Sequence, residues 1–69
     1  MNDLKGYIMP IELVKECIGK KCIISLMTGK GQFTGIVKEI EAYWVKIQEE
    51  DSIRIINGVA IRDIKIISK

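Results

Sequence analysis

The side chains that could carry out chemistry in this chain are few, and histidine is absent. Without an imidazole the chain cannot form Ser-His-Asp or Cys-His catalytic groupings, or a zinc site that uses histidine. Cys17 and Cys22 are the only cysteines, and they are too few for a four-cysteine zinc site. Nothing in the sequence points to export, so we interpret both as buried free thiols.

Two carboxylates, Glu39 and Glu41, stand two positions apart and would share one face of a strand. Acid–base catalysis by such a pair needs a cleft and a partner group tuned to exchange a proton. No histidine or further acid accompanies them in a recognisable pattern. The sequence therefore predicts a non-enzymatic protein with no metal site and no cofactor.

The residues best suited to binding are aromatic and amide side chains. Tyr43 and Trp44 are adjacent, and a nucleic-acid base can stack on such a ring for about 1–3 kcal/mol. Because neighbours in a strand point to opposite faces, we expect one of them to cover the core and the other to lie on the surface. Asn57 could present an amide at a pore, but an Asn-Gly pair more often supplies the positive φ of a tight turn, which is the structure that we predict for Asn57-Gly58.

The charged residues indicate a mixed surface. The chain has 11 basic and 9 acidic residues, a net charge of +2, which is too mild to predict nucleic-acid or membrane binding by itself. The two signs interleave along the chain, although an oligomer would repeat each cation and let several copies bind phosphates jointly. The candidate RNA- or partner-binding residues are Tyr43, Trp44, Lys46, Arg54, Asn57 and Arg62.

The elements that must position these residues follow from the period of the apolar side chains. Residues 10–18 have helical spacing, with Pro10 in the first turn and Gly19 as the stop. From Lys21 the period changes to two, which predicts strands over 21–27, 32–40, 43–48, 52–56 and 59–68. The step of three from Ile61 to Ile64 suggests a helical turn before the last strand resumes.

The predicted fold is mainly β, a short N-terminal helix followed by five antiparallel strands in a strongly bent small barrel. Gly35 inside the second strand indicates a sharp bend or a close backbone approach. Residues 10–69 form the single domain, and residues 1–9 are expected to be a flexible lead-in. Fifteen isoleucines support the β assignment, because β-branched side chains suit a pleated surface.

Isoleucines are too numerous for one core of this size. Alternation places Val45, Ile47, Ile53 and Ile55 inward, and it places Ile23, Ile36 and Ile56 on the opposite face. Ile66 and Ile67 are adjacent and cannot both point inward. A chain of 69 residues buries only about three-fifths of its surface, so a lone copy would be marginal. We therefore predict a homo-oligomer, with Ile56, Ile66 and Ile67 at the interface.

Three segments carry a family likeness. Their order and spacing match the first strand, the first motif and the second motif of Sm-like proteins. The three segments are Ile18–Leu26 with the turn at Gly29, Phe33–Val37 with its strand glycine, and Ile55–Ile64. Over residues 10–67 the chain resembles the Sm-like superfamily, which includes the Sm and Lsm proteins and bacterial Hfq. The resemblance implies a bent barrel, rings assembled through the fourth and fifth strands, and RNA as a ligand.

The likeness weakens at the uridine pocket of that family. The family's aspartate, asparagine and arginine fall on Glu41, Val45 and Asn57 here, while Tyr43 keeps the stacking position. Valine cannot hydrogen-bond a base, and an amide cannot make the charged contact of a guanidinium. The resemblance thus implies weak RNA binding, poorly selective for uridine and dominated by phosphate contacts.

Two functions remain open on the sequence. The first is an Sm-like homo-oligomer that acts by binding, with RNA as a weak ligand. The alternative is an SH3-like protein-interaction module without a nucleic-acid role, which Val45 and Asn57 favour. No apolar run approaches 18 residues and the first residues lack a signal-peptide core, so we expect a cytoplasmic protein without a membrane partner.

Overall fold

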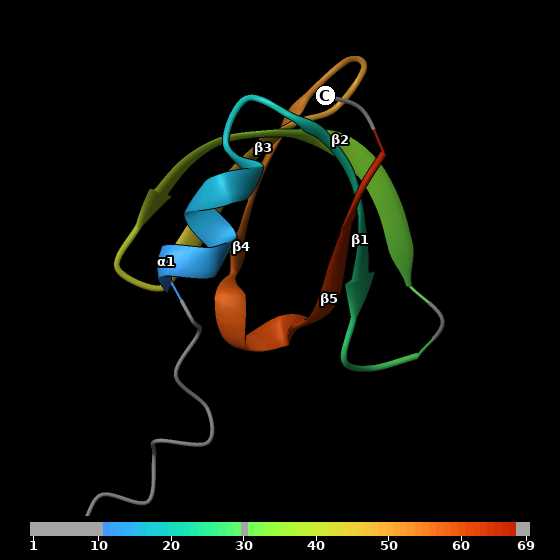
Figure 1. The fold of residues 1–69 in the computed structure, drawn as a ribbon. Coiled ribbons are helices and arrows are strands. Elements are labelled where there is room, and N and C mark those ends of the chain that lie inside the picture. The colour runs from blue at the N-terminus through green and yellow to red at the C-terminus, as the bar shows by residue number, and fades with distance from the viewer. Residues whose placement is uncertain (1–10, 30, 68–69) are drawn as a thin grey trace, which may run out of the picture.

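The computed structural model describes residues 11–29 and 31–67 of the chain (Figure 1). Its elements are α1 (Ile11–Val14), η2 (Lys15–Cys17), β1 (Lys21–Leu26), β2 (Gln32–Glu41), β3 (Trp44–Gln48), β4 (Ile53–Asn57), η3 (Gly58–Ala60) and β5 (Ile61–Ile66). The prediction of one short helical segment followed by five antiparallel strands is confirmed. The predicted lead-in over residues 1–9 lies outside the described residues.

All five strands belong to one sheet in the order β4-β3-β2-β1-β5, with antiparallel pairing throughout. The sheet is strongly curved, and β2 arches from the side of β3 and β4 to the side of β1 and β5 (Figure 1). Within the described residues no ladder joins β4 to β5. These two strands are therefore the open edges of the sheet.

The curvature of β2 has two local causes. Gly35 is buried, and a Cβ at this position would meet the Ile47 side chain and lie 2.9 Å from the Gln48 carbonyl oxygen. This is the close backbone approach that the strand glycine predicts. The register then skips Lys38, because Val37 pairs with Ile47 and Glu39 with Lys46. Such a bulge bends a strand and increases its twist, so β2 can pair with both of its neighbours.

The core lies between the curved sheet and the helical segment. Its fully buried side chains come from β1, β2 and β3, and Val14 and Cys17 pack against them from α1 and η2. The fully buried members are Cys22, Ile24, Val37, Val45 and Ile47. Gly19, at φ 86°, ends the helical segment, and its N–H donates to the Val37 carbonyl at 2.7 Å. The predicted inward orientation of Val45 and Ile47 and the predicted helix stop at Gly19 are confirmed.

The predicted inward face of β4 is wrong. Ile53 and Ile55 are 58% and 57% exposed, whereas Ile56 is half-buried and packs against the core. The register explains this orientation, because Ile56 pairs with buried Val45 and therefore shares its face. Isoleucines occur on both faces of β4, so alternation could not indicate which face is buried.

The predictions for the two ends of η3 also need correction. The step from Ile61 to Ile64 is a β-bulge, because Ile61 pairs with Leu26 and Asp63 with Ser25, which leaves Arg62 unpaired in the register. Asn57 has φ −78°, and its Oδ1 accepts a hydrogen bond from the Val59 N–H at 2.9 Å. Asn57-Gly58 therefore begins a 3-10 helix with a side-chain cap and does not form a tight turn with positive φ.

Cys17 and Cys22 are free and buried, as the sequence predicts. Burial raises the pKa of the Cys22 thiol from 9.0 to about 11, and the nearby Cys17 thiol adds to the rise. The unfolded chain therefore loses this proton near pH 9, while the folded chain keeps it until about pH 11. We expect the free energy of unfolding to be unaffected by this group below pH 9 and to fall by about 2–3 kcal/mol as the pH rises to 11.

Urea unfolding at a series of pH values measures this loss. The informative quantity is the difference between the natural chain and Cys22→Ala, because this difference isolates the contribution of the Cys22 thiol. The variant should be less stable at neutral pH, because it leaves a small cavity, but its decline between pH 9 and 11 should be shallower. Parallel pH profiles for the two proteins would contradict the assignment.

Candidate binding surface

The β2–β3 hairpin places the only tryptophan on the outer face of the sheet. Glu41 and Trp44 are partners in the register and flank the two-residue turn Ala42–Tyr43. Ala42 has φ 54°, a conformation that turns usually give to glycine. Val45, the next residue in β3, is fully buried, so alternation directs the Trp44 side chain away from the core.

Both aromatic residues of this turn are exposed, Tyr43 by 43% and Trp44 by 50%. The prediction that one of them covers the core is wrong. Tyr43 belongs to the turn and not to the strand, so the alternation of β3 does not act on it. The residue that covers the core is Val45 instead.

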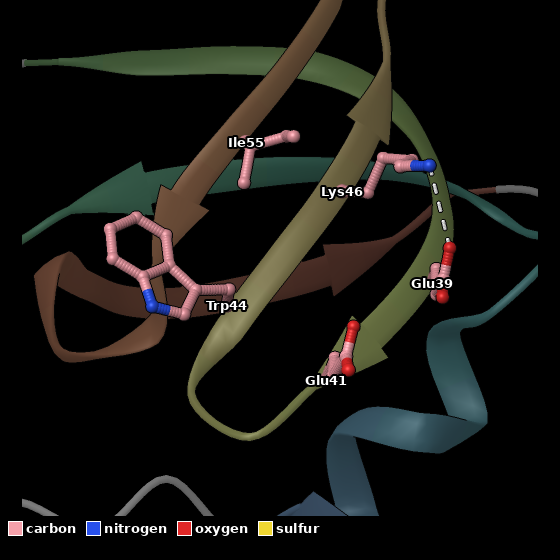
Figure 2. A pocket seen from close by; sticks show the side chains of 5 residues that line it. All are labelled: Glu39, Glu41, Trp44, Lys46 and Ile55. Atoms are coloured by element: carbon pink, nitrogen blue, oxygen red, sulfur yellow. Dashed lines mark ion pairs between the residues drawn. The ribbon is translucent and has the colours of Figure 1, made fainter.

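A shallow depression of about 210 Å³ lies on this outer face (Figure 2). The pairing between neighbouring strands generates it. Across β2 and β3, Glu39 pairs with Lys46 and Glu41 pairs with Trp44, and across β3 and β4, Lys46 pairs with Ile55. We call it the Trp44 depression, and its lining residues are Glu39, Glu41, Trp44, Lys46 and Ile55. It combines an aromatic ring, an aliphatic side chain and three charged groups.

The charges of the Trp44 depression are unequal. The Lys46 ammonium lies 3.4 Å from a carboxylate oxygen of Glu39, and the dashed line in Figure 2 marks this pair. Within residues 11–29 and 31–67, the Glu41 carboxylate makes no hydrogen bond or ion pair. One carboxylate is therefore compensated and the other is not, so the depression is acidic.

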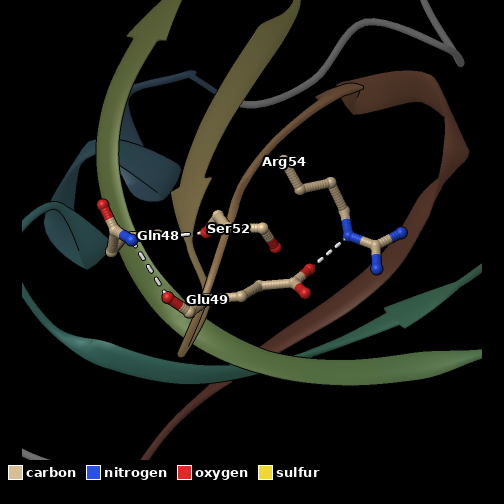
Figure 3. Close-up of polar contacts among 4 residues, drawn as sticks. All are labelled: Gln48, Glu49, Ser52 and Arg54. Carbon is tan, nitrogen blue, oxygen red and sulfur yellow. Dashed lines mark hydrogen bonds and ion pairs between the residues drawn. The ribbon is translucent and has the colours of Figure 1, made fainter.

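Arg54 lies elsewhere, on the inner side of β4 near the β3–β4 turn. Its guanidinium lies 4.2 Å above the Phe33 ring and bonds to the Glu49 carboxylate, which raises the pKa of the guanidinium (Figure 3). The same turn is tied by Gln48, whose side-chain nitrogen donates to the carbonyls of Glu49 at 3.0 Å and of Ser52 at 3.3 Å. Arg54 thus links β4 to the start of β2.

The remaining candidates are dispersed. Arg62 occupies the β5 bulge and contacts Asp63 at 3.3 Å, and Asn57 is half-buried and caps η3. Of the candidate binding residues, the structure brings Trp44 and Lys46 into one depression, with Asn57 beside Trp44 in the register.

Sequence reasoning missed Glu39, Glu41 and Ile55 as members of a binding surface. The shared face of the two glutamates was visible in the sequence, but the reversed orientation of β4 hid Ile55. Residues that meet across three strands carry no joint signal in the sequence, because the pairing register brings them together.

The described part of the chain contains no group of three or more cysteine, aspartate or glutamate side chains that could hold a metal ion. In the same residues, no helix has the length and apolar character needed to cross a membrane. No protein-family model, no curated protein and no solved structure matches this chain.

Proposed function

We propose that the protein is a non-enzymatic, Sm-like small barrel that acts by binding as a homo-oligomer, with RNA as a weak ligand. The observation that carries the proposal is the pair of open sheet edges at β4 and β5, each bearing exposed isoleucines. An edge strand offers unpaired N–H and C=O groups to another chain, and apolar side chains beside it strengthen the pairing. A second copy of the chain has the same two edges, so the β4 edge of one copy could pair with the β5 edge of the next.

The order of elements supports the Sm-like assignment. A short helical segment precedes five antiparallel strands, and the long, bent β2 carries the glycine of the first motif at its close approach to β3. The contact of Arg54 with Phe33 supports a barrel, because it connects edge strand β4 with the beginning of β2. Burial between copies would complete the small core, which by itself gives only marginal stability.

The orientation of β4 changes the interface residues that we propose. Ile56 packs against the core and is withdrawn from the interface. Ile53 on β4, and Ile66 and Ile67 at the end of β5, remain 58%, 42% and 45% exposed and are the apolar groups beside the edges. Each contributes at most about 1.5–3 kcal/mol when fully buried, which is enough for a few of them to govern association.

The RNA component of the proposal rests on contacts between basic side chains and RNA phosphates. Tyr43 is exposed and can stack on a base, but Val45 is fully buried and Asn57 uses its amide oxygen to cap η3. Arg62 and the exposed lysines of each copy would supply phosphate contacts, repeated around the oligomer. Binding of this kind is weakly selective, because phosphates carry no sequence information.

Measuring solution mass and then titrating short U-rich and A-rich RNA tests the proposal. We expect a species larger than the 7.8 kDa monomer at micromolar concentration. We expect weak binding to both RNAs that declines steeply with salt, since each neutralised phosphate releases counterions. Tyr43→Ala should weaken it by at most about 1–3 kcal/mol. A monomer at high micromolar concentration would refute the assembly. Tight, uridine-selective binding would refute RNA binding through phosphate contacts.

The second candidate function is a protein-interaction module without a nucleic-acid role. The acidic character of the Trp44 depression favours it, because the only tryptophan then lines the same depression as an uncompensated carboxylate that repels phosphates. A complete lack of RNA binding at low salt would favour this alternative.

A further inference from the structure

We propose that the Trp44 depression binds the cationic side chain of an arginine or lysine from a partner polypeptide. This inference goes beyond oligomerisation and RNA binding, and it uses a different surface. It rests on one depression that an exposed indole, an exposed isoleucine and an uncompensated carboxylate line from three strands; the indole lies on the β4 side of β3 and the Glu41 carboxylate on the β2 side (Figure 2).

The apolar part of the depression suits the stem of such a side chain. Trp44 is 50% exposed and Ile55 is 57% exposed, and they project from the neighbouring strands β3 and β4 on the same face. Arginine and lysine carry aliphatic stems that lie along apolar surface while the charged head stays in polar surroundings. An indole face also attracts a cation placed above it, and arginine stacks there most readily.

The polar part of the depression suits the charged head. Glu41 pairs with Trp44 in the register, and within the described residues its carboxylate has no ion partner. Glu39 lies on the same face, with its charge offset by Lys46 at 3.4 Å. A side chain that lies across β3 would therefore have its stem beside Trp44 and its charged head near one uncompensated carboxylate and a second one that Lys46 shares. This charge complementarity selects a cationic occupant over a neutral or anionic one.

Nucleic acid fits this surface poorly despite the tryptophan. A phosphate brought within about 4 Å of a carboxylate is repelled by about 1 kcal/mol in water and by more near a protein surface. Pairing of copies at the β4 edge uses backbone groups and the Ile53 side chain, which does not line the depression, so the two surfaces can work together. The depression therefore belongs to recognition of a polypeptide.

Trp44 is the only tryptophan, so its fluorescence and its indole N–H resonance report on this depression alone. The probes are Nα-acetyl-arginine amide, its uncharged isostere Nα-acetyl-citrulline amide, and uridine 5′-monophosphate. We expect saturable changes with the arginine probe, about threefold lower affinity for the citrulline probe, and no change with the nucleotide, because exposed ion pairs change affinity by roughly 1.4- to 5-fold. Equal affinity for arginine and citrulline, or tighter binding of the nucleotide, would overturn the proposal.

Two substitutions give effects of opposite sign. Glu41→Gln should weaken arginine binding about threefold, whereas Lys46→Gln should strengthen it about twofold because it releases Glu39. Glu50→Gln removes the same charge from the exposed β3–β4 turn and should change nothing. Weaker binding in Lys46→Gln, or equal effects of the two glutamate variants, would overturn the proposal. Backbone amide spectra of each variant verify that the fold is retained.

A second copy of the chain is the remaining occupant to test. If it filled the depression, the Trp44 indole resonance would shift with protein concentration in the absence of probe, in step with the solution mass. That result would overturn the proposal for a separate partner. An indole resonance independent of protein concentration, together with the charge-dependent response to arginine, would support it.

Discussion

Gly35→Ala is expected to destabilise the fold by at least about 3 kcal/mol, which is enough to unfold much of a marginal domain. The added Cβ would meet the fully buried Ile47 side chain and would lie 2.9 Å from the Gln48 carbonyl oxygen. Neither neighbour can yield easily, because the first is enclosed by the core and the second belongs to the backbone of β3. Separation of β2 from β3 would also remove the curvature that gives the sheet its shape.

Gly31→Ala is the matched control for this experiment. Its Cβ would meet only the flexible end of the Leu26 side chain, at 3.0 Å, in an exposed turn. We expect a change of less than about 1 kcal/mol, because the leucine can move aside. Urea unfolding of both variants measures the difference, and similar losses of stability would show that the close approach at Gly35 does not limit the fold.

The second large effect is a contrast between two isoleucines of the same strand. Ile56→Lys is expected to cost about 3–5 kcal/mol and to prevent folding, because it removes an apolar side chain that packs on the core and directs an ammonium group towards it. Ile53→Lys makes the same chemical change three residues earlier, at a side chain that is 58% exposed. It should leave the stability of the monomer nearly unchanged and weaken self-association.

Circular dichroism and solution mass separate these outcomes. Ile53→Lys should keep the β spectrum and give a smaller species, whereas Ile56→Lys should lose the spectrum. Ile53 does not line the Trp44 depression, so arginine binding should survive in Ile53→Lys. A folded Ile56→Lys variant would contradict the orientation of β4, and an unchanged mass for Ile53→Lys would contradict a β4 interface.

The two proposed binding surfaces share one physical origin. The isoleucine-rich β4 has a core-facing residue, Ile56, and exposed residues, Ile53 and Ile55, and it lies at the edge of the sheet. An edge strand with apolar side chains on its outer face provides backbone groups for pairing and an apolar surface for side-chain recognition. We therefore propose one binding mode along the edge of the curved sheet and another on its outer face.

The sequence by itself determined the elements and most of the core. The change of period at Gly19–Lys21 located the helical segment and the first strand, and alternation identified Val45 and Ile47 as buried. Histidine is absent from the composition, and this alone excludes histidine-based catalysis and histidine-based metal binding within the chain. The elements follow from local features, because propensity and periodicity act over neighbouring residues.

Only the tertiary structure decided the orientation of β4, the bulges at Lys38 and Arg62, and the composition of the Trp44 depression. A strand with isoleucines on both faces satisfies either orientation until its register against Val45 selects one. A bulge shifts alternation by one residue, so a step of three resembles a helical turn when the partner strand is unknown. The depression needs Glu41, Trp44 and Ile55 from three strands, and pairing between strands, which the sequence does not encode locally, brings them together.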